Sequence, residues 1–112
     1  MRMEVQKYNQ IAVLGIQGEF THEVVKSFED TVSSLLAESE ITGIVLDMSK
    51  VVLLDSATLE SLLEFNERCR DHLRQLKLAG LDETCRKILE VTRILGEFDA
   101  YDELNEAVKS FA

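Results

Sequence analysis

The feature that most constrains the fold is the alternation of short apolar runs with segments of helical periodicity. The runs at residues 11–16 and 44–48 are continuous and rich in strand-forming side chains. Between them, from Thr21 onward, apolar residues recur every three or four positions, as on a helix with one buried face. Because this alternation continues along the chain, it predicts an α/β fold with a mixed, mostly parallel sheet.

The predicted order of elements is β-β-α-β-α-β-α-(β)-α, with four to five strands and about four helices. No proline, low-complexity tract or repeat interrupts the 112 residues, so residues 1–112 are expected to form one domain. Gly18 is expected to end the second strand, Gly80 to end the strand at residues 76–79, and Gly96 to end the third helix. The expected ranges are strands at 3–8, 11–16, 44–48 and 76–79, helices at 21–36, 57–73, 84–95 and 101–111, and a short strand at 97–98.

The balance of charge limits the classes of partner. There are 21 acidic and 12 basic residues, and the formal net charge is −9. A polyanion repels nucleic acid and anionic membrane surfaces, so neither is an expected partner. No run approaches the ~18 apolar residues of a membrane span, and residues 1–10 lack the apolar core of a signal peptide. We therefore expect a cytoplasmic protein whose partner has a basic face or is recognised by shape.

Metal, redox and catalytic motifs are not found. Cys69 and Cys85 fit neither a zinc knuckle nor a CxxC pair, which favours reduced, mostly buried thiols. His22 and His72 stand far apart and outside any HxxxH spacing, so no metal site is expected. The chain has no Walker-type loop, GxGxxG or GxSxG elbow, and no base stands beside Ser56 in the sequence. We expect no cofactor and no enzymatic activity.

The most specific stretch is residues 44–59, which read IVLDMSKVVLLDSATL. An apolar strand ends at Asp47, a second apolar run follows, and Asp55 and Ser56 then open a helix. A helix N-terminus has unpaired N–H groups and favours negative charge, so Ser56 can act there simply as a cap. A phosphate on Ser56 would add roughly −1.5 to −2 charges without unfolding the helix. A partner docked there would meet new charge beside Asp55, which predicts a binding switch.

This stretch resembles the STAS domain family, the anti-sigma factor antagonists of bacteria. The family shows a strand ending in LDLS, an apolar run, and DS followed by a small residue, glycine and leucine. Gly18-Glu19-Phe20 is similar to the family's GEL turn after the early strand. Residues 78–81 (LAGL), 86–89 (RKIL) and 94–98 (ILGEF) match the later strand, the third helix and the terminal segment. The resemblance therefore covers nearly the whole chain.

The resemblance implies a regulatory protein that is switched by phosphorylation of Ser56. We expect it to be a monomer or weak dimer. Unphosphorylated, it would bind an anti-sigma factor that is also a serine kinase of the histidine-kinase-like ATPase type, and so release a sigma factor. The kinase would phosphorylate Ser56, and a phosphatase would reverse the modification. The residues expected to contact or position the partner are Thr21, His22, Asp47, Asp55, Thr58 and Leu59.

Two positions depart from the family pattern. Thr58 stands where the family has glycine, and its β-branched side chain would hold a partner's backbone at a distance. Thr21, where many members carry Asp, is expected to cap the first helix but brings no charge. His22 also fits a solvated side chain, and Asp47 and Asp55 also fit loop hydrogen bonding. These departures leave open a second hypothesis, a phosphorylation-independent scaffold or subunit of a sensory assembly or transporter.

Overall fold

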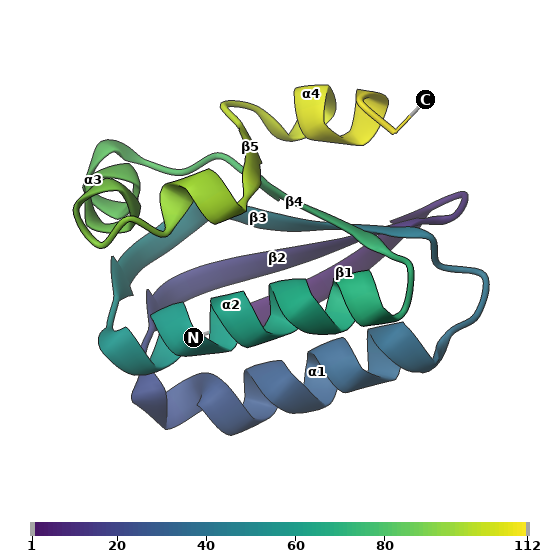
Figure 1. Ribbon diagram of the computed structural model, residues 1–112, viewed down its shortest axis with the longest axis horizontal. Coiled ribbons are helices and arrows are strands. Elements are labelled where there is room, and N and C mark those ends of the chain that lie inside the picture. The colour runs from purple at the N-terminus through teal and green to yellow at the C-terminus, as the bar shows by residue number, and fades with distance from the viewer. Residues whose placement is uncertain (1, 112) are drawn as a thin grey trace.

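A five-stranded sheet in the order β1-β2-β3-β4-β5 organises the computed structural model, which describes residues 2–111 (Figure 1). β1 runs antiparallel to β2, and the other neighbouring strands are parallel. The predicted mixed, mostly parallel α/β fold is therefore confirmed. The elements are β1 Arg2–Tyr8, β2 Ile11–Phe20, η1 His22–Val24, α1 Val25–Ala37, β3 Gly43–Leu54, α2 Ser56–Asp71, β4 Gln75–Ala79, α3 Glu83–Val91, η2 Leu95–Glu97, β5 Asp99–Tyr101 and α4 Leu104–Lys109.

Helices α1 and α2 cover one face of the sheet side by side (Figure 1). Their apolar stripes meet the inward side chains of β2 and β3 in the main hydrophobic core. Phe28 of α1 lies at its centre, with its ring centroid 4.9 Å from Phe20 and 5.8 Å from Phe65, both in edge-on geometry. This core fixes the start of α2 against the end of β2.

The other face of the sheet is covered only in part, by the six-residue helix α4. A small apolar cluster lies beneath it, and Lys77 of β4 is buried there with 6% of its surface exposed. Its ammonium donates to Ser110 Oγ at 2.5 Å, lies 3.6 Å from an Asp99 oxygen and sits 4.3 Å from the centre of the Phe111 ring. These contacts compensate the buried charge and hold the end of α4 on the sheet.

The strand boundaries predicted around Gly18 and Asp47 are wrong. Gly18, at φ 101°, bends β2 without ending it, and Gly18-Glu19-Phe20 form its last residues rather than a turn. The apolar runs at 44–48 and 51–54 belong to one strand, β3. One extra residue of β3 is accommodated between the pairs Gly15–Asp47 and Gln17–Lys50, so pairing with β2 resumes after a bulge. Sequence periodicity is lost at such a bulge.

The third helix ends earlier than predicted. α3 stops at Val91, because Arg93 adopts a left-handed φ of 63° and the Ile94 N–H turns back to the Leu89 carbonyl. Gly96 therefore lies in η2 and does not end the helix. The last strand is β5 at Asp99–Tyr101 instead of residues 97–98, and Tyr101 belongs to it rather than to the C-terminal helix.

Candidate functional site

The start of α2 is capped by Asp55, whereas the sequence pointed to Ser56 as a possible cap. Asp55 is extended, at φ −123° and ψ 178°, as a capping residue must be. Its Oδ1 accepts from the Thr58 N–H at 3.0 Å, and its own N–H donates to Thr58 Oγ1 at 3.2 Å. This reciprocal pair is a capping box. The carboxylate is the stronger acceptor and stands one residue earlier, so it takes the role from the serine.

Ser56 is the first residue of α2, and it is exposed. Because Asp55 already caps the helix, the Ser56 hydroxyl is not needed for that purpose. The capping box engages the N–H of Thr58 but not those of Ser56 and Ala57. An α-helix offers no intrahelical acceptor for N–H groups in its first turn. The exposed Ser56 thus stands at the positive end of the helix dipole, beside two N–H groups that have no intrahelical acceptor.

Thr58 and Leu59 lie inside the domain and not on its surface. Thr58 is 0% exposed and Leu59 is 8% exposed. The Thr58 hydroxyl donates to the Phe20 carbonyl oxygen at 2.9 Å, which ties α2 to the last residue of β2. The threonine that replaces the family's glycine therefore faces inward and cannot keep a partner's backbone away. We correct the expectation that these two side chains contact a partner: they support the site from below.

His22 is joined to Asp55 across a sequence separation of 33 residues. Its backbone N–H donates to Asp55 Oδ2 at 2.7 Å, and its Nδ1 lies 3.1 Å from the same oxygen. Nothing in the sequence pointed to this link. Thr21, predicted to cap the first helix, precedes η1, but its hydroxyl makes no capping bond among the described residues. The Asp55 carboxylate takes that place, since a charged acceptor forms stronger hydrogen bonds.

These hydrogen bonds set the charge of the site. The His22 N–H is the main cause that lowers the pKa of Asp55 to about 2; the Thr58 N–H lowers it further, and partial desolvation opposes both. Asp55 therefore carries a full negative charge at neutral pH. One oxygen of this carboxylate holds η1 and the other holds the first turn of α2, so Asp55 ties the start of the helix that carries Ser56 to the segment after β2.

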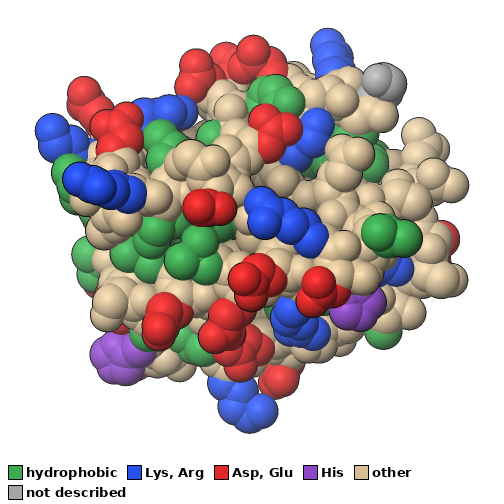
Figure 2. All heavy atoms as spheres, viewed as in Figure 1, with side chains coloured by type: hydrophobic (Ala, Val, Ile, Leu, Met, Phe, Trp, Pro, Cys, Tyr) green, Lys and Arg blue, Asp and Glu red, His purple; other side chains and the backbone are tan. Residues whose placement is uncertain are grey.

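Acidic side chains continue from this point along the surface. Glu60, Glu64 and Glu67 are exposed on α2, and Figure 2 shows acidic groups gathered over α1 and α2. This is the arrangement of a solvated helix face, as expected from their spacing. It also gives the surface next to Ser56 a negative potential that suits a partner with basic side chains.

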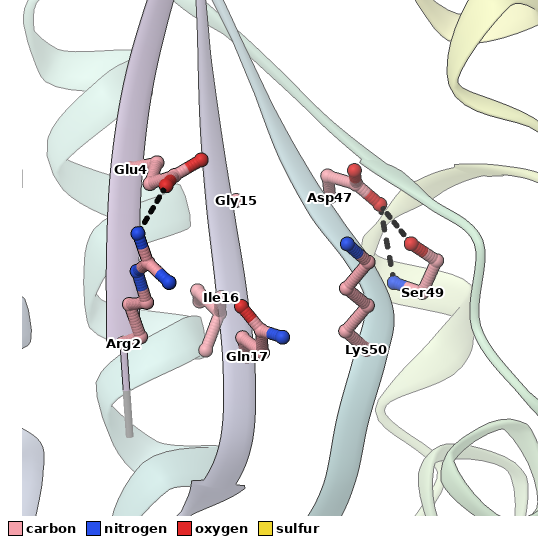
Figure 3. Close-up of a pocket in the computed structure, with 8 residues that line it drawn as sticks. All are labelled: Arg2, Glu4, Gly15, Ile16, Gln17, Asp47, Ser49 and Lys50. Atoms are coloured by element: carbon pink, nitrogen blue, oxygen red, sulfur yellow. Dashed lines mark hydrogen bonds and ion pairs between the residues drawn. The ribbon is translucent and has the colours of Figure 1, made fainter.

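Asp47 does not join the other predicted residues. Its neighbours Leu46 and Met48 point into the core under α1 and α2, so Asp47 points to the opposite face of the sheet. There its Oδ1 accepts from the Ser49 hydroxyl at 2.8 Å and from the Ser49 N–H at 3.1 Å, at the edge of a hollow of about 80 Å³ (Figure 3). The prediction placed Asp47 at a strand end, whereas β3 continues beyond it to Leu54.

The two cysteines are free and buried, as the sequence predicted. Burial raises the pKa of both thiols to about 12, so they remain protonated and unreactive. Within residues 2–111, no group of three or more His, Cys, Asp or Glu side chains is placed to hold a metal ion. No helix in that range is long and apolar enough to cross a membrane.

Comparison with known proteins places this geometry in a family. The model of the STAS domain matches residues 2–107, so the resemblance predicted from the sequence is confirmed. An anti-sigma factor antagonist from Mycobacterium paratuberculosis has a TM-score of 0.87 at 20% identity, covering 97% of this chain and 92% of that one. The Bacillus cell fate determinant SpoIIAA in its phosphorylated form has a TM-score of 0.78 at 16% identity, covering 99% of this chain and 100% of that one.

A third similar structure has a different setting. A sulfate transporter family protein from Wolinella succinogenes has a TM-score of 0.80 at 19% identity, covering 90% of this chain and 84% of that one. At these identities the likeness of all three structures is one of fold. The same arrangement of sheet and helices therefore occurs both in anti-sigma factor antagonists and in a transporter-related protein.

Proposed function

The chain belongs to the STAS domain family, and we propose that it is an anti-sigma factor antagonist-like regulatory protein of the cytoplasm. Its partner is an anti-sigma factor that is also a serine kinase of the histidine-kinase-like ATPase type. Binding of the unphosphorylated domain releases a sigma factor, phosphorylation of Ser56 weakens the complex, and a phosphatase restores it. The domain itself has no catalytic activity in this scheme.

The observation that carries this proposal is the exposed Ser56 hydroxyl at a helix start that other residues already hold in place. The hydroxyl oxygen attacks the γ-phosphorus of ATP, the bond to ADP breaks, and a base of the kinase accepts the proton. Since Asp55 and Thr58 keep the capping box, the domain accepts the phosphate without losing the start of α2. The change is then confined to what a partner meets on the surface.

The weakening of the complex follows from charge and size. Asp55 is already ionised beside Ser56, and Glu60 is exposed one helical turn further along α2. A partner that accommodates these carboxylates when Ser56 is free would also have to accommodate roughly −1.5 to −2 further charges and three oxygens when it is phosphorylated. Desolvating that group in an interface without a new basic partner is unfavourable.

The proposal is tested by binding measurements with the cognate kinase. We expect Ser56→Asp to weaken the complex at least tenfold, by about 1.4 kcal/mol or more. Ser56→Ala should bind as the unphosphorylated wild type does, and it should keep that affinity when ATP is present. Ser39→Asp is the matched control, because Ser39 is exposed in the turn after α1 and adds the same charge away from the site. Equal binding by wild type, Ser56→Asp and Ser56→Ala would remove the mechanism.

Mapping of the phosphate gives a second, independent test. After incubation with kinase and ATP, mass spectrometry should find one phosphate on Ser56 and none on Thr58, whose hydroxyl is fully buried. Ser56→Ala should abolish incorporation. Phosphate on another residue, or undiminished incorporation into Ser56→Ala, would contradict the assignment.

The second candidate is a phosphorylation-independent scaffold or subunit of a sensory assembly or transporter. The similar structure of a sulfate transporter family protein supports it. In this case Ser56→Asp and Ser56→Ala would retain the same partners as the wild type in a pull-down from the native cell, and those partners would be components of the assembly. Recovery of a kinase that is lost only from Ser56→Asp would favour the first candidate.

A further inference from the structure

His22 and Ser56 stand at matching positions beyond two neighbouring strands. Phe20 of β2 pairs with Leu54 of β3 in the parallel register, and His22 and Ser56 each follow two residues later. Parallel neighbours in a sheet lie about 4.8 Å apart, so the two residues emerge side by side at the same end of the sheet. In Figure 1 the segment between β2 and α1 lies beside the start of α2. A group attached to Ser56 is therefore within reach of the His22 side chain.

The contact with Asp55 decides which nitrogen of the His22 ring carries a hydrogen. Because Asp55 is ionised at neutral pH, with its pKa lowered to about 2, its carboxylate can only accept hydrogen bonds. Nδ1, which lies 3.1 Å from Asp55 Oδ2, must therefore be the donor. In the neutral ring this leaves Nε2 as an acceptor without a hydrogen. The His22 N–H fastens the main chain to the same oxygen, whereas 71% of the side chain is exposed and can adjust.

A phosphate on Ser56 would place a second anion beside the Asp55 carboxylate, and a cation between the two would relieve their repulsion. Among residues 2–111, His22 is the one basic side chain paired with Asp55. The last four residues of β3 carry no charge, and the other charged side chains close to His22 and Ser56 in the sequence are all exposed: Glu19, Glu23, Lys26 and Glu60. The lysine of this set is engaged elsewhere, with its Nζ 3.6 Å from an Asp30 oxygen. His22 is thus the group placed to supply the cation.

We propose that His22 takes up a proton from solvent when Ser56 is phosphorylated, and that the imidazolium then bridges the Asp55 carboxylate and the phosphate. The inference rests on the proposed function, since it needs a phosphate at position 56. A phosphate that has lost both protons offers only acceptor oxygens, as the carboxylate does. A ring between two acceptors can bond to both only when both of its nitrogens carry a hydrogen. The phosphate thus draws a proton onto Nε2 and turns back toward η1, so His22 becomes part of the switch.

The test is an NMR titration of both histidine rings of the full chain, from about pH 5 to about pH 9, with and without phosphoserine genetically encoded at position 56. We expect His22 of the phosphoserine protein to hold its proton about tenfold more tightly, and so to titrate about one pH unit higher, than in the unmodified chain. His72, at the opposite end of α2, is the internal control and should titrate alike in both proteins. An unchanged titration of His22 overturns the proposal.

Phosphorus NMR of the same phosphoserine protein gives the reciprocal measurement. The imidazolium favours the doubly ionised phosphate, so His22→Gln, which cannot carry a charge, should move the second ionisation of the phosphate to higher pH. His72→Gln is the matched control, because His72 is also exposed, and it should leave that ionisation unchanged. Equal phosphate titrations in the two variants overturn the proposal. Since the phosphoserine is encoded, neither result depends on a kinase, and the kinase assay described above decides separately whether Ser56 is the natural target.

Discussion

At its first turn α2 is fastened by a capping box and by a carboxylate that also holds η1, whereas beyond its last turn the chain passes through a left-handed leucine that is almost fully exposed. The first end is polar and charged, and its hydrogen bonds fix the backbone around an exposed hydroxyl. Beyond the second end the chain reverses through Leu73, an exposed apolar side chain in a left-handed conformation. A single helix can thus present two surfaces of different chemistry, provided that something other than its ends holds it in place.

The largest expected effect on the free energy of unfolding comes from removing the core contact of Phe65. This variant tests whether core packing, and not the helix ends, holds α2 in place. Phe65 is 1% exposed in the middle of α2 and packs edge-on against Phe28. Phe65→Ala should lower the free energy of unfolding by about 4 kcal/mol, because it removes buried contacts and leaves a cavity. Urea denaturation measures this change. Glu67→Ala, an exposed position on the same helix, should stay within about 0.5 kcal/mol of the wild type. Because alanine favours the helix at both positions, a similar loss in both variants would contradict the view that packing of Phe65 holds α2.

The second-largest expected effect on stability comes from a substitution at the start of α2. Thr58→Val keeps the shape of the side chain but removes the hydroxyl that donates to the Phe20 carbonyl and accepts from the Asp55 N–H. Buried polar groups would then lose their partner, and the unfolding free energy should fall by about 2 kcal/mol. Thr58→Ser is the control, since it retains the hydroxyl and should recover much of the loss. If valine proved as stable as threonine, the link between α2 and β2 would not be structural.

The dependence of stability on acid pH should also differ between the start and the far end of α2. The pKa of Asp55 is lowered from 3.8 to about 2 in the folded protein, so the carboxylate contributes stability above its unfolded pKa. That contribution is lost as the pH falls from about 4 through about 2. Asp55→Asn retains an oxygen for the Thr58 N–H but does not titrate, and it deprives the His22 N–H of its charged acceptor.

The measurement is the denaturation midpoint at about pH 5 and about pH 2. We expect Asp55→Asn to be less stable than the wild type at the higher pH, and to lose less stability on acidification. Asp71→Asn, at the exposed far end of the same helix, should leave the acid dependence as it is in the wild type. Identical pH profiles for wild type and Asp55→Asn would show that the His22–Asp55 link does not persist in solution.

The sequence predicted what depends on local pattern. The order of strands and helices, the mixed sheet and the buried thiols follow from periodicity and composition. The predicted helical stripes hold except at their ends, because Leu73, Leu95 and Tyr101 lie outside the helices predicted for them. The D-x-x-T spacing of Asp55 and Thr58 is also present in the sequence, but the prediction assigned the cap to Ser56, which lies between them. Thr58 was therefore placed on the surface, although its hydroxyl is the inward half of the capping box.

What the sequence did not predict depends on contacts between distant segments. The His22–Asp55 link exists only because η1 and α2 meet at the edge of the core, and the bulge in β3 exists only against β2. The prediction therefore placed Asp47 at the end of a strand, whereas β3 continues past the bulge to Leu54. The left-handed turns at Arg93 and Leu73 were missed because neither residue is a glycine, the usual signal for such a turn.

The smallest expected effect is a gain in stability just beyond the C-terminal end of α2. Leu73→Gly relieves the left-handed strain of a leucine, which outweighs the greater freedom of glycine in the unfolded chain, so stability should rise by about 0.5–1 kcal/mol. The midpoint of thermal unfolding should rise by about 3–6 °C. Leu73→Ala separates backbone from side chain, because alanine keeps the strain but loses the projecting group. If alanine stabilised the domain as much as glycine, the exposed side chain, and not the left-handed backbone, would be the unfavourable element.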